Sequence, residues 1–168
     1  MKFIATLLTL FLLVSCSGYQ PGGSKPAHLA EVQSVYIPLA QNKTLFPRAE
    51  AIVTNAVVDA FVQDGTYRLG TPSSSDASLL ITLKEINYRQ VRSSEFDSLR
   101  SEELEMEVTL AWTLQDPLKP GVALEKGIAK SRTRFFVDPS LQTARRNALP
   151  DALARASHTI VSRLADGF

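Results

Sequence analysis

The sequence predicts an α+β domain in which two helices pack on one face of a mostly antiparallel sheet of four or five strands. Two observations support this. Two segments repeat apolar residues at the spacing of an amphipathic helix, and three long segments alternate apolar and polar residues as half-buried strands do. A length of 168 residues suits one domain, and a hydrophobic content of 45% is enough to form a core.

The first expected strand, residues 32–39, is short and directs alternate apolar residues to one face: Val35, Ile37 and Leu39. Proline has no backbone N–H to donate, so Pro38 indicates that this strand ends there or lies at a sheet edge. A second short extended piece is expected at residues 66–69, before a loop rich in serine.

The helices are expected at about residues 47–64 and 140–164. Pro47 suits the first turn of the first helix, and Gly65 suits the position just past its end. Pro150 removes a hydrogen bond from any helix interior, so it must either start the main part of the second helix or kink it. The expected apolar stripe of the first helix is Ile52, Val53, Ala56, Val57, Ala60 and Phe61. The expected stripe of the second is Leu149, Ala152, Leu153, Ala156, Ile160 and Leu164.

Three long strands are expected at residues 77–92, 102–114 and 122–136. In the middle strand the inward residues are Leu104, Met106, Val108, Leu110, Trp112 and Leu114. A hairpin centred on Leu118 and Lys119 would place three glutamates opposite three cations on the outward face: Glu107 with Lys130, Glu105 with Arg132, and Glu103 with Arg134. The same register sets small residues beside large ones: Ser131, Ala129 and Gly127 beside Met106, Val108 and Leu110.

The cations of these strands therefore have two interpretations. Cross-strand pairing with the glutamates is the favoured one, and binding of a phosphate-bearing ligand is the alternative. The candidate ligand-binding residues are Arg89, Arg92, Lys130, Arg132 and Arg134, and the four arginines would gather near the loop between Ser93 and Ser101.

The composition argues against several function classes. A net charge of +1 gives no bulk positive field for nucleic acid. One cysteine and two histidines leave little for a disulfide framework, a metal site or acid–base catalysis, and no phosphate loop or nucleophile elbow is present. We therefore expect no enzyme activity, no metal and no cofactor. His28 is expected to be solvated in a tether, and His158 to be a partly buried or surface residue of the last helix.

The first residues are typical of a secretory signal, because Lys2 precedes a dozen largely apolar residues, fewer than the roughly 20 needed to span a bilayer. They end in Leu13-Val14-Ser15-Cys16, which resembles a bacterial lipobox; the alternative is an ordinary signal with a stray cysteine. The expected organisation is a signal peptide at 1–15, a lipidated tether at 16–30 and one domain at 31–168. Two or three acyl chains on Cys16 would give a stable anchor.

Several segments together resemble the LptE-type lipopolysaccharide-assembly lipoproteins. Their order carries the likeness: Cys16-Ser17-Gly18-Tyr19, Val35-Tyr36-Ile37-Pro38, Asn42-Lys43-Thr44, the helix at 49–64, the strand entry at 75–81, and the closing Ile160-Val161-Ser162-Arg163-Leu164. Pro150, inside the last helix, departs from the family pattern.

The resemblance implies an outer-membrane lipoprotein that plugs the LptD barrel, helps it assemble and assists delivery of lipopolysaccharide to the outer leaflet. Its implied partners are an LptD-type barrel, lipopolysaccharide, and outer-membrane lipid through the anchor on the periplasmic side. Ser17, with no aspartate after the cysteine, resembles an outer-membrane address. Removal of Lys2 with the signal leaves equal numbers of basic and acidic residues, which suits a polar barrel lumen. The alternatives are a lipidated adaptor, such as a cell-wall synthase activator or a pilotin, and a lipid-anchored hydrolase.

Overall fold

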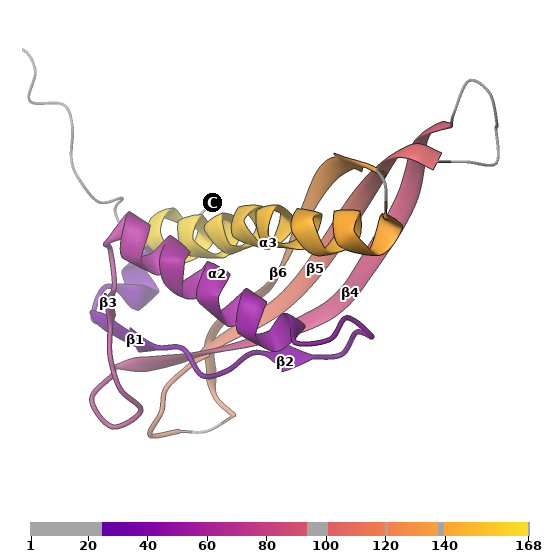
Figure 1. Ribbon diagram of the computed structural model, residues 1–168. Helices are drawn as coiled ribbons and strands as arrows, with labels where there is room; N and C mark the ends of the chain where they lie inside the picture. The colour runs from indigo at the N-terminus through magenta and orange to yellow at the C-terminus, as the bar shows by residue number, and fades with distance from the viewer. Residues whose placement is uncertain (1–24, 94–100, 120, 138–139, 168) are drawn as a thin grey trace, which may run out of the picture.

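The computed structural model describes residues 25–93, 101–119, 121–137 and 140–167. The expected signal peptide, Cys16 and the tether as far as residue 24 lie outside these residues, and so does most of the loop between Ser93 and Ser101. Figure 1 shows two helices crossing the same face of a group of long strands. The expected pair of helices on one face of a sheet is confirmed.

The sheet is mixed and has six strands, which corrects the prediction of a mostly antiparallel sheet of four or five. The long strands β4 (Ala77–Ser93), β5 (Ser101–Gln115) and β6 (Ala123–Phe136) are antiparallel neighbours, as expected. Three short strands add parallel pairs: β1 (Ser34–Tyr36) lies between β3 (Arg68–Leu69) and β4, and β2 (Gln41–Asn42) pairs with β4. Strands of two or three residues are too short to show a period, and a period would not specify parallel or antiparallel pairing, so the sequence did not indicate these pairs.

Of the expected first strand at residues 32–39, only Ser34–Tyr36 forms a strand, β1, which ends two residues before Pro38; β2, at Gln41–Asn42, lies beyond the expected range. The side chain of Asp76 fixes the start of β1: its Oδ2 accepts hydrogen bonds from the backbone N of Gln33 at 3.0 Å and from the N and Oγ of Ser34, both at 2.8 Å. These bonds, led by that of the Ser34 hydroxyl, lower the pKa of Asp76.

The helices are α2 (Ala49–Asp64) and α3 (Leu141–Asp166), preceded in the chain by a short 3₁₀ turn, η1 (Ala27–Leu29). Gly65 and Gly167 follow the helix ends with φ of 75° and 79°, left-handed values that glycine adopts without strain. The helix α3 begins at Leu141, so Pro150 does not start it. Pro150 is exposed, where water can bond the carbonyl that loses its N–H partner.

The core lies between the helices and the covered face of the sheet. The predicted stripe of α3 is completely buried, and Val53, Val57, Ala60 and Phe61 of the α2 stripe are buried as well. Gly127 of β6 lies beside Trp112 of β5, where an added Cβ would be 2.7 Å from the indole. The indole fills the space that a side chain at position 127 would need.

The β5–β6 register differs by two residues from the prediction. Arg132 is opposite Glu107, Arg134 is opposite Glu105, and Lys130 is opposite Thr109. The connection runs from Asp116 to Val122, longer than a turn centred on Leu118 and Lys119, and the register shifts once more beside Leu114. A shift of two residues preserves which side chains face outward, so both the charge pairing and the size matching survive with different partners.

The packed part of the chain includes residues assigned to the tether. Leu29 is fully buried in the core. His28, expected to have no partner, has its Nε2 3.1 Å from Oε2 of Glu125, whose other oxygen accepts a bond from Arg163. The three residues join the start of the fold to β6 and α3.

Candidate functional site: an ion-pair face and a basic groove

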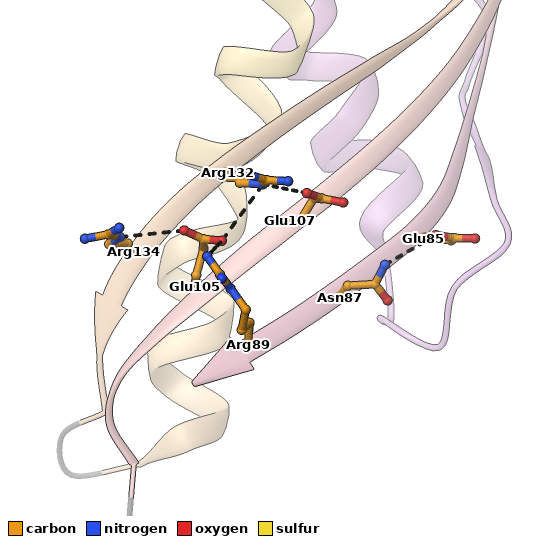
Figure 2. Close-up of polar contacts among 7 residues, drawn as sticks. All are labelled: Glu85, Asn87, Arg89, Glu105, Glu107, Arg132 and Arg134. Atoms are coloured by element: carbon orange, nitrogen blue, oxygen red, sulfur yellow. Dashed lines mark hydrogen bonds and ion pairs between the residues drawn. The ribbon is translucent and has the colours of Figure 1, made fainter. Parts of the chain in front are cut away.

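The sheet face opposite the helices carries alternating charges, and we give the name ion-pair face to the group of eight that surrounds Glu105 and Glu107. They are Arg89, Arg92, Glu103, Glu105, Glu107, Lys130, Arg132 and Arg134. Glu105 of the central strand joins arginines of both neighbours. Its carboxylate oxygens lie 2.8 Å from Arg89, 3.6 Å from Arg134 and 3.9 Å from Arg132 (Figure 2).

Two further glutamates complete the ion-pair face. Arg132 donates to Glu107 at 2.6 Å, and Arg92 lies 4.0 Å from Glu103. Lys130 makes no ion pair with any described residue. The structure thus brings together all five predicted ligand-binding residues on one face, and four of them have carboxylate partners.

The pKa values of the ion-pair face reflect this mutual stabilisation. The hydrogen bond from Arg89, followed by the charges of the neighbouring arginines, lowers the pKa of Glu105. The hydrogen bond to Glu107 and the charges of Glu107 and Glu105 raise the pKa of Arg132. Glu105 is 8% exposed, and it remains ionised at neutral pH because the arginines replace its lost water.

A groove of about 890 Å³ lies at the edge of β4 that faces away from β5, and we call it the basic groove. Its three walls are the loop from Lys43 to Arg48, the β4 segment from Lys84 to Tyr88, and the first turns of α3. It contains five cations: Lys43, Arg48, Lys84, Arg145 and Arg146. The apolar part of its lining includes Leu45, Phe46, Ile52 and Ile86.

The loop wall of the groove is held by its own side chains. Asn42 donates to the carbonyl of Phe46 at 2.8 Å and accepts from the N and Oγ1 of Thr44 at 2.9 and 2.8 Å. Thr44 Oγ1 in turn accepts from the N of Phe46 at 3.2 Å. These bonds leave Leu45 at the tip fully exposed. The wall is therefore formed before anything binds to it.

The cations of the basic groove differ from those of the ion-pair face in their partners. None of the five makes an ion pair within the described ranges. Arg145 instead stacks on the ring of Tyr88, 4.2 Å from its centroid, and its buried Nε has no hydrogen-bond partner among the described residues. Tyr88 meets Phe135 edge to face at 6.5 Å.

Sequence reasoning missed the basic groove. Its cations come from three segments separated by about forty and sixty residues, so no linear pattern groups them. The Asn42-Lys43-Thr44 triplet was the one available signal, because its residue types favour a side-chain-bonded turn. In the sequence alone, this triplet contributes only to the family resemblance.

Among the described residues, no cluster of three or more histidine, cysteine, aspartate or glutamate side chains is arranged to hold a metal ion. No described helix combines the length and apolar character needed to cross a bilayer.

Comparisons with known proteins give a family and a set of similar folds. The model of the LptE family, described as lipopolysaccharide-assembly, matches residues 32–164. A search of curated proteins finds no match. A lipoprotein from Caulobacter crescentus is similar with a TM-score of 0.55 and 19% identity, over 77% of this chain and 86% of that chain.

A PelC dodecamer subunit from Paraburkholderia phytofirmans has a TM-score of 0.57 and 17% identity, over 84% of this chain and 95% of that chain. Protein XCC0632 from Xanthomonas campestris has a TM-score of 0.53 and 14% identity, over 83% and 87%. At these identities the solved structures show a shared fold.

The family match covers most of the chain, including all six strands, α2 and nearly all of α3. It agrees with the resemblance carried by the sequence motifs, and the similar structures include other lipoproteins. The family comprises non-enzymatic envelope lipoproteins that work with the lipopolysaccharide-transport machinery. The chain belongs to the LptE family of lipopolysaccharide-assembly lipoproteins.

Proposed function

We propose that this protein is an outer-membrane lipoprotein that plugs an LptD-type barrel, helps the barrel assemble and assists delivery of lipopolysaccharide to the outer leaflet. The family match over residues 32–164 carries the proposal. The surface supports it, because the polar interior of a barrel favours a plug with both signs of charge, and the ion-pair face has that character. Lipid on Cys16 would hold the plug at the membrane.

Lipopolysaccharide would contact the ion-pair face at Arg89, Arg92, Lys130, Arg132 and Arg134. Ion pairing does not occupy these residues completely, because a guanidinium has five donors and the arginine side chains remain 61–69% exposed. Lys130 has no carboxylate partner among the described residues, so a change at Lys130 tests ligand binding without breaking an ion pair between strands. Lys130→Glu should weaken binding of purified lipopolysaccharide while the melting temperature stays unchanged. Unchanged binding to this variant and to Arg134→Glu would contradict the contact.

The second candidate is a lipidated adaptor of another envelope complex. The observation that favours it is the fold shared with the PelC dodecamer subunit, over almost the whole of that chain. A ring-forming adaptor would be a large homo-oligomer in detergent, whereas a barrel plug would be one copy bound to one barrel. Light scattering of the purified complex distinguishes the two.

Affinity isolation of the tagged full chain from detergent-solubilised outer membranes tests the proposed partner. Copurification of a barrel of LptD size in equal amount is the expected result. Recovery of a cell-wall synthase or a secretin, with no such barrel, would favour the adaptor.

The anchor has a separate test. Cys16→Ala should leave the domain folded but move it from the membrane fraction to the soluble fraction in cells that lack the barrel. Mass spectrometry of the unaltered protein should show a cleaved chain with acyl groups on Cys16. An unmodified thiol would contradict the anchor.

A further inference from the structure

We propose that the basic groove binds an extended acidic segment of a partner protein, which adds as a strand to the free edge of β4. The occupant is defined by its chemistry, a stretch of alternating acidic and apolar residues, and the proposal does not depend on which protein supplies it. It adds a protein-binding site to a surface separate from the ion-pair face.

The first observation is the open edge of β4. On the side away from β5, this strand pairs with β1 at Ala77 and Ser78 and with β2 at Thr82 and Leu83. The last bond on that side runs from the N of Lys43 to the carbonyl of Leu83, at 3.0 Å. From Lys84 to Ser93 the strand continues with β5 as its one strand neighbour among the described residues. An edge of this kind presents N–H and C=O groups that an extended chain can pair with.

The second observation is that the open edge and the groove coincide. Residues 84–88 form one wall of the groove, and the loop that follows β2 forms another. A strand added at the edge would therefore lie inside the groove. Every second side chain of that strand would point to the α3 side of the sheet, where Ile86, Tyr88 and Arg145 lie. The exposed Leu45 and the half-buried Ile86 and Tyr88 provide the apolar contacts.

The third observation is the charge. The groove holds five cations and a single acidic residue, Glu85, whose carboxylate accepts a bond from Asn87 at 3.3 Å. The start of α3 adds the partial positive charge of a helix N-terminus. An acidic segment would supply carboxylates to cations that no described residue pairs with. A lipid headgroup could meet the charges, but it has no row of backbone groups to pair with the edge of β4, so an extended peptide makes both kinds of contact.

The test uses the full chain in nonionic detergent and a synthetic octapeptide of alternating glutamate and valine, blocked at both ends. Calorimetric titration should show binding, and an octapeptide of alternating lysine and valine should not bind. Two N-methylated versions of the glutamate–valine peptide are also made. One carries methyl groups on the odd-numbered backbone nitrogens and the other on the even-numbered ones, so each blocks one edge of the extended peptide. The version whose methyl groups lie on the edge that faces β4 should bind about tenfold more weakly or worse. The other version should bind as the unmodified peptide does.

Matched variants locate the site. Lys84→Glu with Arg146→Glu reverses two groove cations and should weaken peptide binding about tenfold. Lys119→Glu with Lys126→Glu makes the same change of charge in the β5–β6 turn and on β6, and should change binding less than about twofold. Circular dichroism should show that both variants are folded.

Three outcomes overturn the proposal. In the first, the acidic peptide does not bind, and the charges of the edge then serve only to keep it from pairing. In the second, both methylated peptides bind as well as the unmodified one, so that charge alone holds the ligand. In the third, soluble short-chain phosphatidylglycerol binds, dependent on Lys84 and Arg146, while the peptides do not. The groove would then be a lipid site.

Discussion

The ion-pair face and the basic groove lie on opposite sides of the same strand, β4, and both are rich in arginine. On the ion-pair face, four arginines have glutamate partners, three of them around Glu105. In the groove, five cations have no carboxylate partner among the described residues. Arginine is thus ion-paired across strands in one region and has no carboxylate partner among the described residues in the other.

The cause of the difference lies in what each neighbouring element supplies. The strand β5 offers a glutamate at every second position from Glu103 to Glu107, directly between two strands that carry arginines. The groove is lined by the loop from Lys43 to Arg48, α2, β4 and α3, which together contribute one acid. The charges on the face are thus paired because neighbouring strands place them opposite one another. The groove has an excess of positive charge because the tertiary fold brings together cations from separate segments.

The largest effect is expected from the covered side of these strands, which sets the register independently of charge. Gly127→Val places a branched side chain where even a Cβ would be 2.7 Å from the indole of Trp112. Overpacking of this kind costs about 1–3 kcal/mol. Chemical unfolding should therefore show a lower free energy of unfolding for this variant.

Ile128→Val is the matched control, since Ile128 is the next residue of β6 and is 67% exposed. Its free energy of unfolding should change by less than about 0.5 kcal/mol. Equal losses in both variants would mean that the contact between Gly127 and Trp112 does not limit the packing.

The next effect is expected from reversing one arginine of the ion-pair face. Arg132→Glu places a carboxylate beside Glu107 and Glu105, so repulsion replaces two attractions and the melting temperature should fall. The combined change of Glu107→Arg and Arg132→Glu restores opposite charges at the same pair and should recover part of the loss. Melting at low and high salt checks the cause, because salt screens exposed charges. A combined variant no more stable than the single one would contradict pairing as the role of Arg132.

The long elements could be predicted from the sequence because each is long enough to show its hydrophobic period several times. The thirteen residues from 102 to 114 alternate almost without exception, and the structure has the same inward and outward sets. Sequence reasoning located β1 and β3 within expected extended pieces, but it missed β2, the parallel pairing of the short strands and the β5–β6 register. Two-residue strands have no period, and the length of a turn decides which residues face each other.

The candidate site was predicted in the same uneven way. The ion-pair face could be foreseen because its residues lie on adjacent strands, where position along the chain determines position in space. The basic groove could not, because Lys43, Lys84 and Arg145 approach one another only after β2, β4 and α3 have packed. A site formed by adjacent strands can be predicted from local sequence patterns. A site formed between separate elements can be identified only once the tertiary structure is known.

A smaller effect is expected from acid. Bonds from Arg89 to Glu105 and from the Thr133 hydroxyl to Asp151 lower the pKa of each carboxyl. A lowered pKa in the folded state gives stability that is present above the ordinary carboxyl value, near pH 4, and is lost as the pH falls through the folded value. Urea unfolding should show a steep loss below about pH 4, and Glu105→Gln should flatten it. An unchanged slope in Glu105→Gln would mean that its ion pairs do not differ between the folded and unfolded states.

The smallest effect on stability is expected from a charge reversal in the groove. Its comparison with the same change on the ion-pair face is the most direct test of the difference between the two regions. Arg146→Glu makes the same change of charge as Arg132→Glu, but it removes no described ion pair and relieves repulsion among neighbouring cations. Its free energy of unfolding should therefore stay within about 0.5 kcal/mol of the unaltered chain. Urea unfolding of the two variants side by side measures the contrast. If Arg146→Glu were as destabilising as Arg132→Glu, the groove cations would be structural, and their lack of partners would no longer argue for a ligand.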